Sequence, residues 1–310
     1  MLSRNRSGGD RARAAPAADR RIGRTSEYAA VRRGTSIAKL GGVRRLPLAA
    51  ILLFCVSSLF AGDAPVVSIL SYHEVVPGGV PPFKTHPPPG FPDNPTEANR
   101  YTLDSKVFAE QLDYIAKNYE VIPLVDLVDY ISGRRENLPS KSVVITVDDG
   151  YLSTYKEIFP LMQKREMPFT LFVYPQIVDL GKNYLTWQQI AEMAKAGVDI
   201  ESHTFSHPLL RAKNHPEMTP DAYGAFLKHE LLDSRNLIEE KTRKPVKFIA
   251  YPYSDVDPTV TLATRQFGYE AALYDSLTGA RLSRSTRPMH LVRYAVVHDT
   301  SLDQLKAVLP

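Results

Sequence analysis

The chain has one cysteine, Cys55, and one long apolar run, which contains that cysteine. If this run is removed on export, the rest of the protein has no disulfide and no thiol chemistry. The 310 residues also contain no G-x-S-x-G elbow, so serine-hydrolase chemistry has no support. No internal repeat is evident beyond an alternation of strand-like and helix-like segments.

Positive charge is concentrated near the N-terminus. Residues 1–45 hold eleven Arg and one Lys against three acidic residues, a net charge of +9, although the whole chain carries only +4. The remaining residues therefore carry −5, and nothing in this body indicates nucleic-acid binding. We predict that residues 1–45 form a basic, disordered leader. A true start near Val43 would explain its unusual composition.

Residues 46–64 have the pattern of an export signal. The apolar run spans 46–61, follows Arg44 and Arg45, and leads into small residues. It is short for a membrane span, so we expect a cleaved signal peptide, with a retained N-terminal anchor as the alternative. Cys55 follows Phe54, whereas lipidation signals have a small residue there. The protein is therefore expected to be exported to the periplasm, cell envelope or extracellular space.

Residues 65–310 alternate β-branched runs with amphipathic segments. Strands are predicted at 66–72, 119–123, 143–147, 169–174, 198–202, 246–250, 269–274 and 291–297. Helices are predicted between them, including one capped by Ser153, one opened by a capping box at Thr186, and a long one from Thr219 to about Lys241. This alternation predicts an α/β fold, a single-domain distorted (β/α)7-8 barrel around a parallel sheet.

Polar side chains recur where the predicted strands end. In barrels of this kind the chemistry lies at the C-terminal ends of the strands. The residues found there are His73, Asp148, Asp149, His203, Tyr253 and Asp275. The loop at 77–100, rich in Pro and Gly and containing His86, is long enough to be a lid or a binding segment, or else an insertion without a role.

Two stretches predict a metal centre. Residues 143–150 (Val-Val-Ile-Thr-Val-Asp-Asp-Gly) lead a buried strand into adjacent carboxylates, which is costly unless a cation is nearby. A simple turn is the alternative. His203 and His207, four residues apart after a later strand, complete a two-His, one-carboxylate set with Asp149. Such a metal would polarise a carbonyl and acidify a water, leaving Asp148 as general base.

These stretches resemble a known family. Residues 146–150 (Thr-Val-Asp-Asp-Gly) resemble the TFDDG motif of NodB-type polysaccharide deacetylases, carbohydrate esterase family 4, with Val for Phe. Residues 203–207 match their H-[ST]-x-x-H motif, and 251–254 (Tyr-Pro-Tyr-Ser) stand where they carry R-x-P-Y-G. The stretches 71–73, 138–139 and 248–253 resemble most the poly-β-1,6-N-acetylglucosamine deacetylases of biofilm exopolysaccharide systems.

The resemblance implies a function and its residues. It implies hydrolysis of N-acetyl groups from a glycan with zinc, or cobalt, nickel or iron, by a protein that we expect to be monomeric. Asp148 would be the base, and the backbone N–H of Tyr253 would help to hold the oxyanion. The family's third-motif Arg falls on Ala250, which predicts a base without its usual partner and with a higher pKa. The general acid would be His298 or His73, with His290 a further rival and Asp275 orienting it.

Several aromatic side chains are candidates for stacking on sugar rings. They are Tyr174, Phe205, Tyr251, Tyr253 and Trp187, the last being equally suited to core packing. Peptidoglycan, chitin oligomers and acetylated xylan remain alternative substrates. A catalytically dead glycan-binding module is the rival from another class, motivated by Ala250 and by the unassigned acid.

Overall fold

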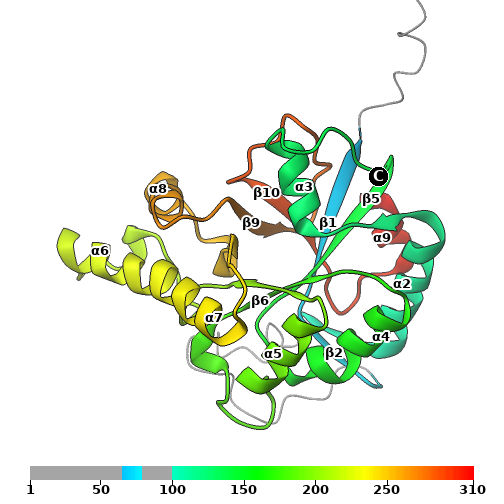
Figure 1. Ribbon diagram of the computed structural model, residues 1–310, viewed down its shortest axis with the longest axis horizontal. Helices are drawn as coiled ribbons and strands as arrows, with labels where there is room; N and C mark the ends of the chain where they lie inside the picture. The colour runs from blue at the N-terminus through cyan, green and yellow to red at the C-terminus, as the bar shows by residue number, and fades with distance from the viewer. Residues whose placement is uncertain (1–64, 79–99) are drawn as a thin grey trace, which may run out of the picture. The chain divides into compact units, whose positions relative to one another are not determined.

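Seven parallel strands form a closed barrel in the computed structural model, which describes residues 65–78 and 100–310 (Figure 1). The strands, in order around the barrel, are β1 (Val66–Tyr72), β5 (Lys141–Val147), β6 (Thr170–Val173), β7 (Asp199–Ser202), β8 (Phe248–Ala250), β9 (Ala271–Ser276) and β10 (Leu291–Ala295). The pairing of β10 with β1, and of β1 with β5 along its whole length, closes the ring. The predicted barrel is confirmed.

Helices surround the strands. They are α2 (Ser105–Asn118), α3 (Leu124–Ile131), α4 (Phe159–Lys164), α5 (Trp187–Lys195), α6 (Pro220–Leu227), α7 (Ser234–Thr242), α8 (Pro258–Gln266) and α9 (Leu302–Val308). The predicted capping box at Thr186 is present, and a second one at Ser301 starts α9. The predicted long helix is present as α6 and α7, joined by a π-helical segment, Lys228–Asp233.

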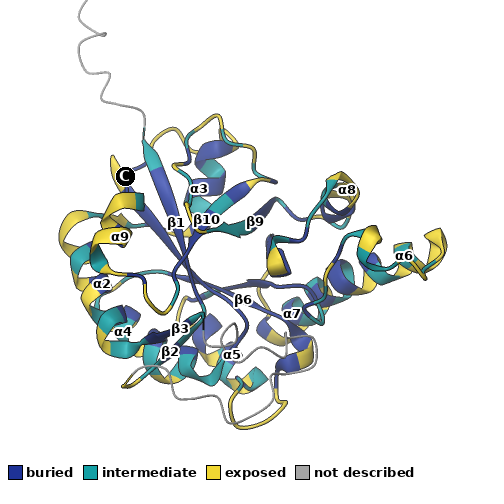
Figure 2. Ribbon diagram, turned by 180° about the vertical axis from the view of Figure 1, so that it is seen from behind, coloured by how far each residue is buried: buried dark blue, intermediate teal, exposed yellow. Residues whose placement is uncertain are grey.

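The strands divide the apolar residues into two sets. Alternate residues of the strands, which include Val67, Val144, Phe172 and Leu273, face the barrel interior. They form one apolar cluster with the buried residues of α3. The other set faces the outer helices. Figure 2 shows the barrel strands almost wholly buried and the outer helix faces exposed. Toward the C-terminal ends the inward positions become polar, and this change places the candidate site at the barrel mouth.

Three features differ from the sequence predictions. Ser153 makes no capping bond; its hydroxyl accepts a hydrogen bond from the backbone N–H of Val75 at 3.3 Å, and a π-helical turn, Thr154–Ile158, precedes α4. The predicted strand at 119–123 is only β4 (Glu120–Val121), which pairs with the N-terminal half of β5 outside the ring. A separate small sheet, β2 (Glu74–Val76) with β3 (Thr102–Asp104), was not predicted.

Several predictions fall outside the described residues. These are the leader at 1–45, the export segment at 46–64 with Cys55, and most of the 77–100 loop with His86. Within 65–78 and 100–310, no helix is both long and apolar enough to cross a bilayer.

Candidate active site

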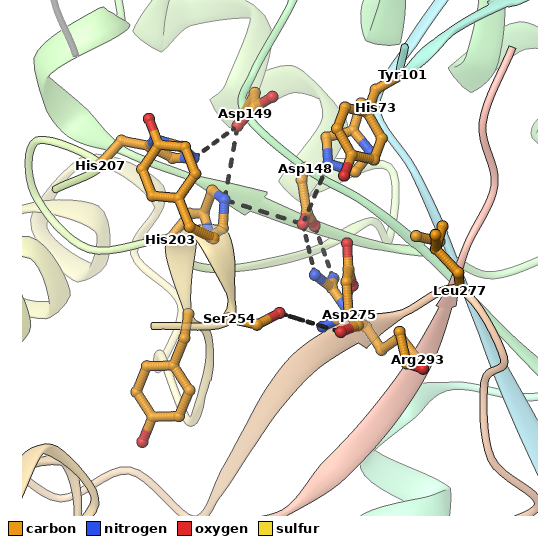
Figure 3. A pocket seen from close by; sticks show the side chains of 14 residues that line it. His73, Tyr101, Asp148, Asp149, His203, His207, Ser254, Asp275, Leu277 and Arg293 are labelled. Atoms are coloured by element: carbon orange, nitrogen blue, oxygen red, sulfur yellow. Dashed lines mark hydrogen bonds and ion pairs between the residues drawn. The ribbon is translucent and has the colours of Figure 1, made fainter. Parts of the chain in front are cut away.

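A pocket of about 380 Å³ opens at the C-terminal ends of the barrel strands (Figure 3). Eight of the residues proposed from the sequence line it: His73, Asp148, Asp149, His203, His207, Tyr251, Tyr253 and Asp275. They come from the ends of β1, β5, β7, β8 and β9, so the parallel barrel brings distant parts of the chain to one place. Arg293, which the sequence reasoning missed, reaches the same pocket from β10.

Asp149, His203 and His207 form a buried cluster. Oδ1 of Asp149 lies 3.6 Å from Nε2 of His203 and 3.4 Å from Nε2 of His207. The ligand atoms of all three lie within 4.8 Å of one another, and each residue is buried. The separations leave room for an ion between the atoms, and Asp149 Oδ1 has no hydrogen-bond partner among the described residues.

These three side chains suit a divalent cation. Burial and the neighbouring His203 keep the pKa of His207 well below its usual value, so the ring is neutral, as a ligand must be. Burial raises the pKa of Asp149, so the ionised carboxylate would be favoured by a cation bound beside it. The Nδ1 atom of His203 lies 2.8 Å from the carbonyl oxygen of Ala250, which directs Nε2 toward the cluster.

The backbone of the histidine loop is held by a buried acid. Glu230, in the segment between α6 and α7, accepts hydrogen bonds from the backbone N–H of Phe205 at 3.0 Å and of Ser206 at 2.9 Å. The hydroxyl of Ser206 donates to the same carboxylate at 2.6 Å. Thr204 and His207 have positive φ values of 66° and 60°, which only such restraint maintains in residues other than glycine.

Arg293 provides the cation that the third motif lacks. Its guanidinium donates from Nη1 and Nη2 to the two carboxylate oxygens of Asp148, at 2.8 and 2.6 Å. Both side chains are 1% exposed. The prediction of a base without a partner is therefore wrong: the cation comes from β10 instead of the position of Ala250. The predicted rise in pKa is also wrong, because Arg293 and His203 outweigh burial and lower the pKa of Asp148 to about 2.

The same guanidinium joins a second acid to the network. Nε of Arg293 lies 2.7 Å from Oδ1 of Asp275, and the hydroxyl of Ser71 donates to Oδ2 at 3.2 Å. Nε2 of His73 lies 4.0 Å from Oδ2 of Asp148, and its ring packs on Tyr101 with centroids 4.4 Å apart. His73, Asp148 and Asp275 also lie close enough to hold an ion, but both carboxylates already pair with the guanidinium of Arg293.

Tyr253 lies beside the histidines at the rim. Its ring meets that of His207 edge to face at 4.7 Å, and the side chain is 45% exposed. Tyr253 and the next residue, Ser254, have positive φ values of 55° and 54°. The Ser254 hydroxyl accepts from the backbone N–H of Asp275 at 2.9 Å, which ties this turn to β9. Strained backbone is thus concentrated at the barrel mouth.

Other predicted residues lie elsewhere. Tyr174 is buried against His207, with centroids 5.0 Å apart, so it supports the histidine and is not placed to stack on a sugar. Phe205 packs on His229 outside the pocket. Trp187 packs against the outer core. His298 is exposed in a separate hollow, so the structure does not bring this predicted acid to the reacting groups.

His290 and Tyr251 also make contacts that bear on their predicted roles. His290 is exposed and bonded to the Tyr274 hydroxyl, away from the pocket. Tyr251 lines the pocket, but its hydroxyl donates to Oγ1 of Thr264 at 2.9 Å and is committed to the core.

Comparison with known proteins gives a consistent result. Residues 135–272 match the family model for polysaccharide deacetylase, a region that includes the Asp pair, the His pair and Tyr253. The YxkH protein of Bacillus subtilis is 29% identical over 153 residues, covering 49% of this chain and 51% of that protein. Poly-β-1,6-N-acetyl-D-glucosamine N-deacetylase of Staphylococcus epidermidis is 23% identical over 180 residues, covering 56% and 61%.

Solved structures share the fold over most of the described chain. IcaB from Ammonifex degensii has a TM-score of 0.62 and 26% identity, covering 80% of this chain and 97% of that one. The Streptococcus pyogenes deacetylase PplD, in complex with acetate, has the same TM-score at 20% identity, covering 80% and 99%. The chain spans about half to three fifths of the length of the two curated relatives.

Proposed function

We propose that this chain, which carries a polysaccharide deacetylase domain, hydrolyses N-acetyl groups from an exopolysaccharide of N-acetylhexosamine. The observation that carries the proposal is that one pocket holds both an ionised carboxylate, Asp148, and a candidate divalent-cation site. Asp148 is held ionised against Arg293, and Nε2 of His203 lies within 3.9 Å of Asp148 and 3.6 Å of Asp149. A base beside a divalent-cation site is an arrangement suited to metal-assisted hydrolysis of an amide.

The residues of the chain divide the reaction between them. Asp148, ionised across the neutral range, takes a proton from the attacking water as its oxygen bonds to the amide carbon. The carbonyl oxygen, now negatively charged, is held by the backbone N–H of Tyr253. Asp149, His203 and His207 would hold a divalent ion, most readily zinc, which when bound polarises the carbonyl and acidifies the water.

His73 is the general acid in this proposal. It lines the pocket on the Asp148 side, whereas the exposed His298 lies in another hollow. Its protonated ring gives a proton to the sugar nitrogen as the carbon–nitrogen bond breaks, which releases acetate and leaves a free amine. Asp275, whose carboxylate lies within 4.8 Å of a ring nitrogen of His73, is the group that would orient this acid, and it is also ion-paired to Arg293.

The substrate proposed is poly-β-1,6-N-acetyl-D-glucosamine. A relative at 23% identity bears the name of that deacetylase, and IcaB at 26% identity shares the fold. Peptidoglycan, chitin oligomers and acetylated xylan are the alternatives. The hypothesis of a catalytically dead binding module rested on two observations, the missing Arg at Ala250 and the unassigned acid. The first no longer supports it, because Arg293 pairs with Asp148. We further propose that the protein is exported, acts as a monomer and associates with the cell envelope.

The test is release of acetate by the protein loaded in turn with zinc, cobalt and nickel. Poly-β-1,6-N-acetylglucosamine, chitin oligomers and acetylated xylan are the substrates, and Asp148→Asn is the control. Release from the first polymer that is lost in the variant is the expected result. Metal binding without release from any substrate would overturn the proposal and favour a glycan-binding module.

A further inference from the structure

A second hollow adjoins the candidate active site. It has a volume of about 450 Å³ and lies between the end of β10, the 297–300 turn and the start of α9. Leu277, 54% exposed, lines both hollows. Residues adjacent in the sequence also line the two hollows on either side. Tyr101 and Ala295 line the first hollow, and their neighbours Arg100 and Tyr294 line the second.

Hydrogen bonds hold the 297–300 turn, which lines the second hollow, in place. The backbone N–H of His298 donates to the carbonyl of Arg100 at 2.8 Å, and the N–H of Val297 donates to Oγ1 of Thr300 at 2.9 Å. In Figure 3, Leu277 lies on the side of the pocket opposite to His207. Because Leu277 lines both hollows, it lies where the one meets the other.

The side chains of the second hollow suit a sugar. Arg100 and Gln304 supply N–H donors, and the exposed carboxylate of Asp299 supplies acceptors. Asp299 has no ion pair or hydrogen bond to another described residue. Leu277 and Val297 add apolar surface. Hydroxyl groups both donate and accept, and a sugar ring presents apolar C–H faces, so this combination matches a hexose better than an ion or a lipid chain.

Exposed apolar side chains mark the same face of the barrel. The described residues leave five large hydrophobic side chains exposed, and four of them lie on loops that follow β6, β7, β8 and β9. These four are Leu180, Leu209, Tyr253 and Leu277. Apolar surface gathered around a site indicates a ligand larger than the pocket itself.

We propose that the hollow lined by Leu277, His298 and Asp299 binds the sugar next to the one being deacetylated, so that the protein selects a polymer over a single residue. This inference rests on the proposed function and extends it: the reacting acetamide occupies the pocket, Leu277 supports the linkage, and the adjacent hexosamine fills the second hollow. His298, which the sequence suggested as an acid, then has a binding role.

The experiment compares kcat/KM for β-1,6-linked N-acetylglucosamine oligomers of one to five residues. The zinc-loaded wild type is measured beside the double variant His298→Ala/Asp299→Ala. Asp303→Ala is the matched control, because it removes the same charge from the exposed start of α9, where the side chain is 89% exposed and outside the hollow. Binding of the tetramer to Asp148→Asn, with and without the double substitution, is measured by calorimetry.

The expected result is a steep gain in kcat/KM from the monosaccharide to longer oligomers in the wild type and in Asp303→Ala. In the double variant this gain should shrink about tenfold, through KM, as expected for the loss of two hydrogen-bonding side chains. An equal gain in all three proteins would overturn the second subsite while leaving the deacetylase proposal intact. Absence of turnover together with equal tetramer binding would overturn both.

Discussion

At the scale of single residues, the guanidinium of Arg293 satisfies three side chains inside the barrel. It donates hydrogen bonds to Asp148 and, at 3.1 Å from Nη1, to the hydroxyl of Thr146, and it forms an ion pair with Asp275. It also lies over the ring of Phe172 at 5.4 Å. A buried ion pair adds little net stability, but removing one partner leaves an uncompensated charge. The pair is therefore better understood as keeping Asp148 ionised.

Arg293→Gln should cost both activity and stability. Without the cation the pKa of Asp148 rises, because burial then dominates, and the acid limb of kcat/KM moves to higher pH. We expect a loss of about 100-fold or more at neutral pH and a loss of unfolding free energy of roughly 3–5 kcal/mol. A pH–rate profile and urea unfolding measure these effects. Arg287→Gln, an exposed arginine beside β10, is the control; an unmoved acid limb in Arg293→Gln would contradict the role given to Arg293.

Asp255 gives the fold a dependence on acid pH. Its buried carboxylate accepts from the backbone N–H of Arg211 at 2.8 Å, from the guanidinium of Arg211, and from Asn214 at 2.8 Å. Burial raises the pKa of Asp255, but these donors outweigh it and bring the pKa below its usual value. The stabilisation is therefore complete above the unfolded pKa of about 3.9 and is lost as the pH falls through the lower folded value.

Asp255→Asn should remove this part of the fall in unfolding free energy at acid pH. The variant is expected to be less stable than wild type at pH 6, with the difference shrinking toward pH 3. Urea midpoints across that range measure it. Asp303→Asn removes an exposed carboxylate and should leave the profile unchanged, since solvent screens its pair with Lys306. A constant difference between Asp255→Asn and wild type from pH 6 to pH 3 would contradict the linkage.

At the scale of elements, the loop that carries both histidines depends on a carboxylate 23 residues beyond His207. Glu230 fixes the backbone of 205–206, and the hydroxyl of Ser234, at the start of α7, donates to the carbonyl of Thr204 at 2.8 Å. Groups that orient metal ligands in this way contribute strongly to affinity. The helical segment behind the loop therefore supports the candidate metal site, although it contributes no candidate ligand.

Glu230→Ala should weaken zinc binding by about 10–100-fold. The loop N–H groups lose their acceptor, and Thr204 and His207, which have positive φ values, lose the restraint that holds them. Competition with a chromophoric chelator measures the affinity. Glu240→Ala, an exposed acid on α7, is the matched control. Wild-type affinity in Glu230→Ala would show that the loop keeps its geometry without this acid.

The elements and residues that follow a local pattern were predictable. The β-branched run before Asp148 and the four-residue spacing of His203 and His207 each lie within one short stretch. Arg293 was not found because its partner is 145 residues away. Its signal was an arginine at an inward position of the last strand, between Leu291 and Ala295, where a charge requires a buried partner.

The small sheet of β2 and β3 escaped prediction for a different reason. Its strands have three residues each, too few for a periodic pattern. Ser153 was misassigned because a serine before a helix usually caps it. Here the hydroxyl instead accepts from the backbone N–H of Val75, in β2. The second error thus arises where a tertiary contact overrides a local preference.

At the scale of the whole molecule, a metal bound by Asp149, His203 and His207 would join β5 to the loop after β7. Free zinc at 100 times its dissociation constant should therefore stabilise the fold by about 2.7 kcal/mol, or roughly 5–10 °C in melting temperature. Calorimetry with zinc or with chelator measures the shift. Asp149→Ala should abolish it and Asp303→Ala should retain it; an equal shift in both would locate the ion elsewhere.

The closure of the barrel by β10 also has a consequence for the order of folding. β10 lies between β1 and β9 and carries the only guanidinium that reaches Asp148 in the described part of the chain. A chain in which β10 has not yet docked has two open strand edges, on β1 and β9, and leaves the buried carboxylate of Asp148 without its guanidinium. Closure of the barrel and pairing of Asp148 are therefore completed in the same folding step.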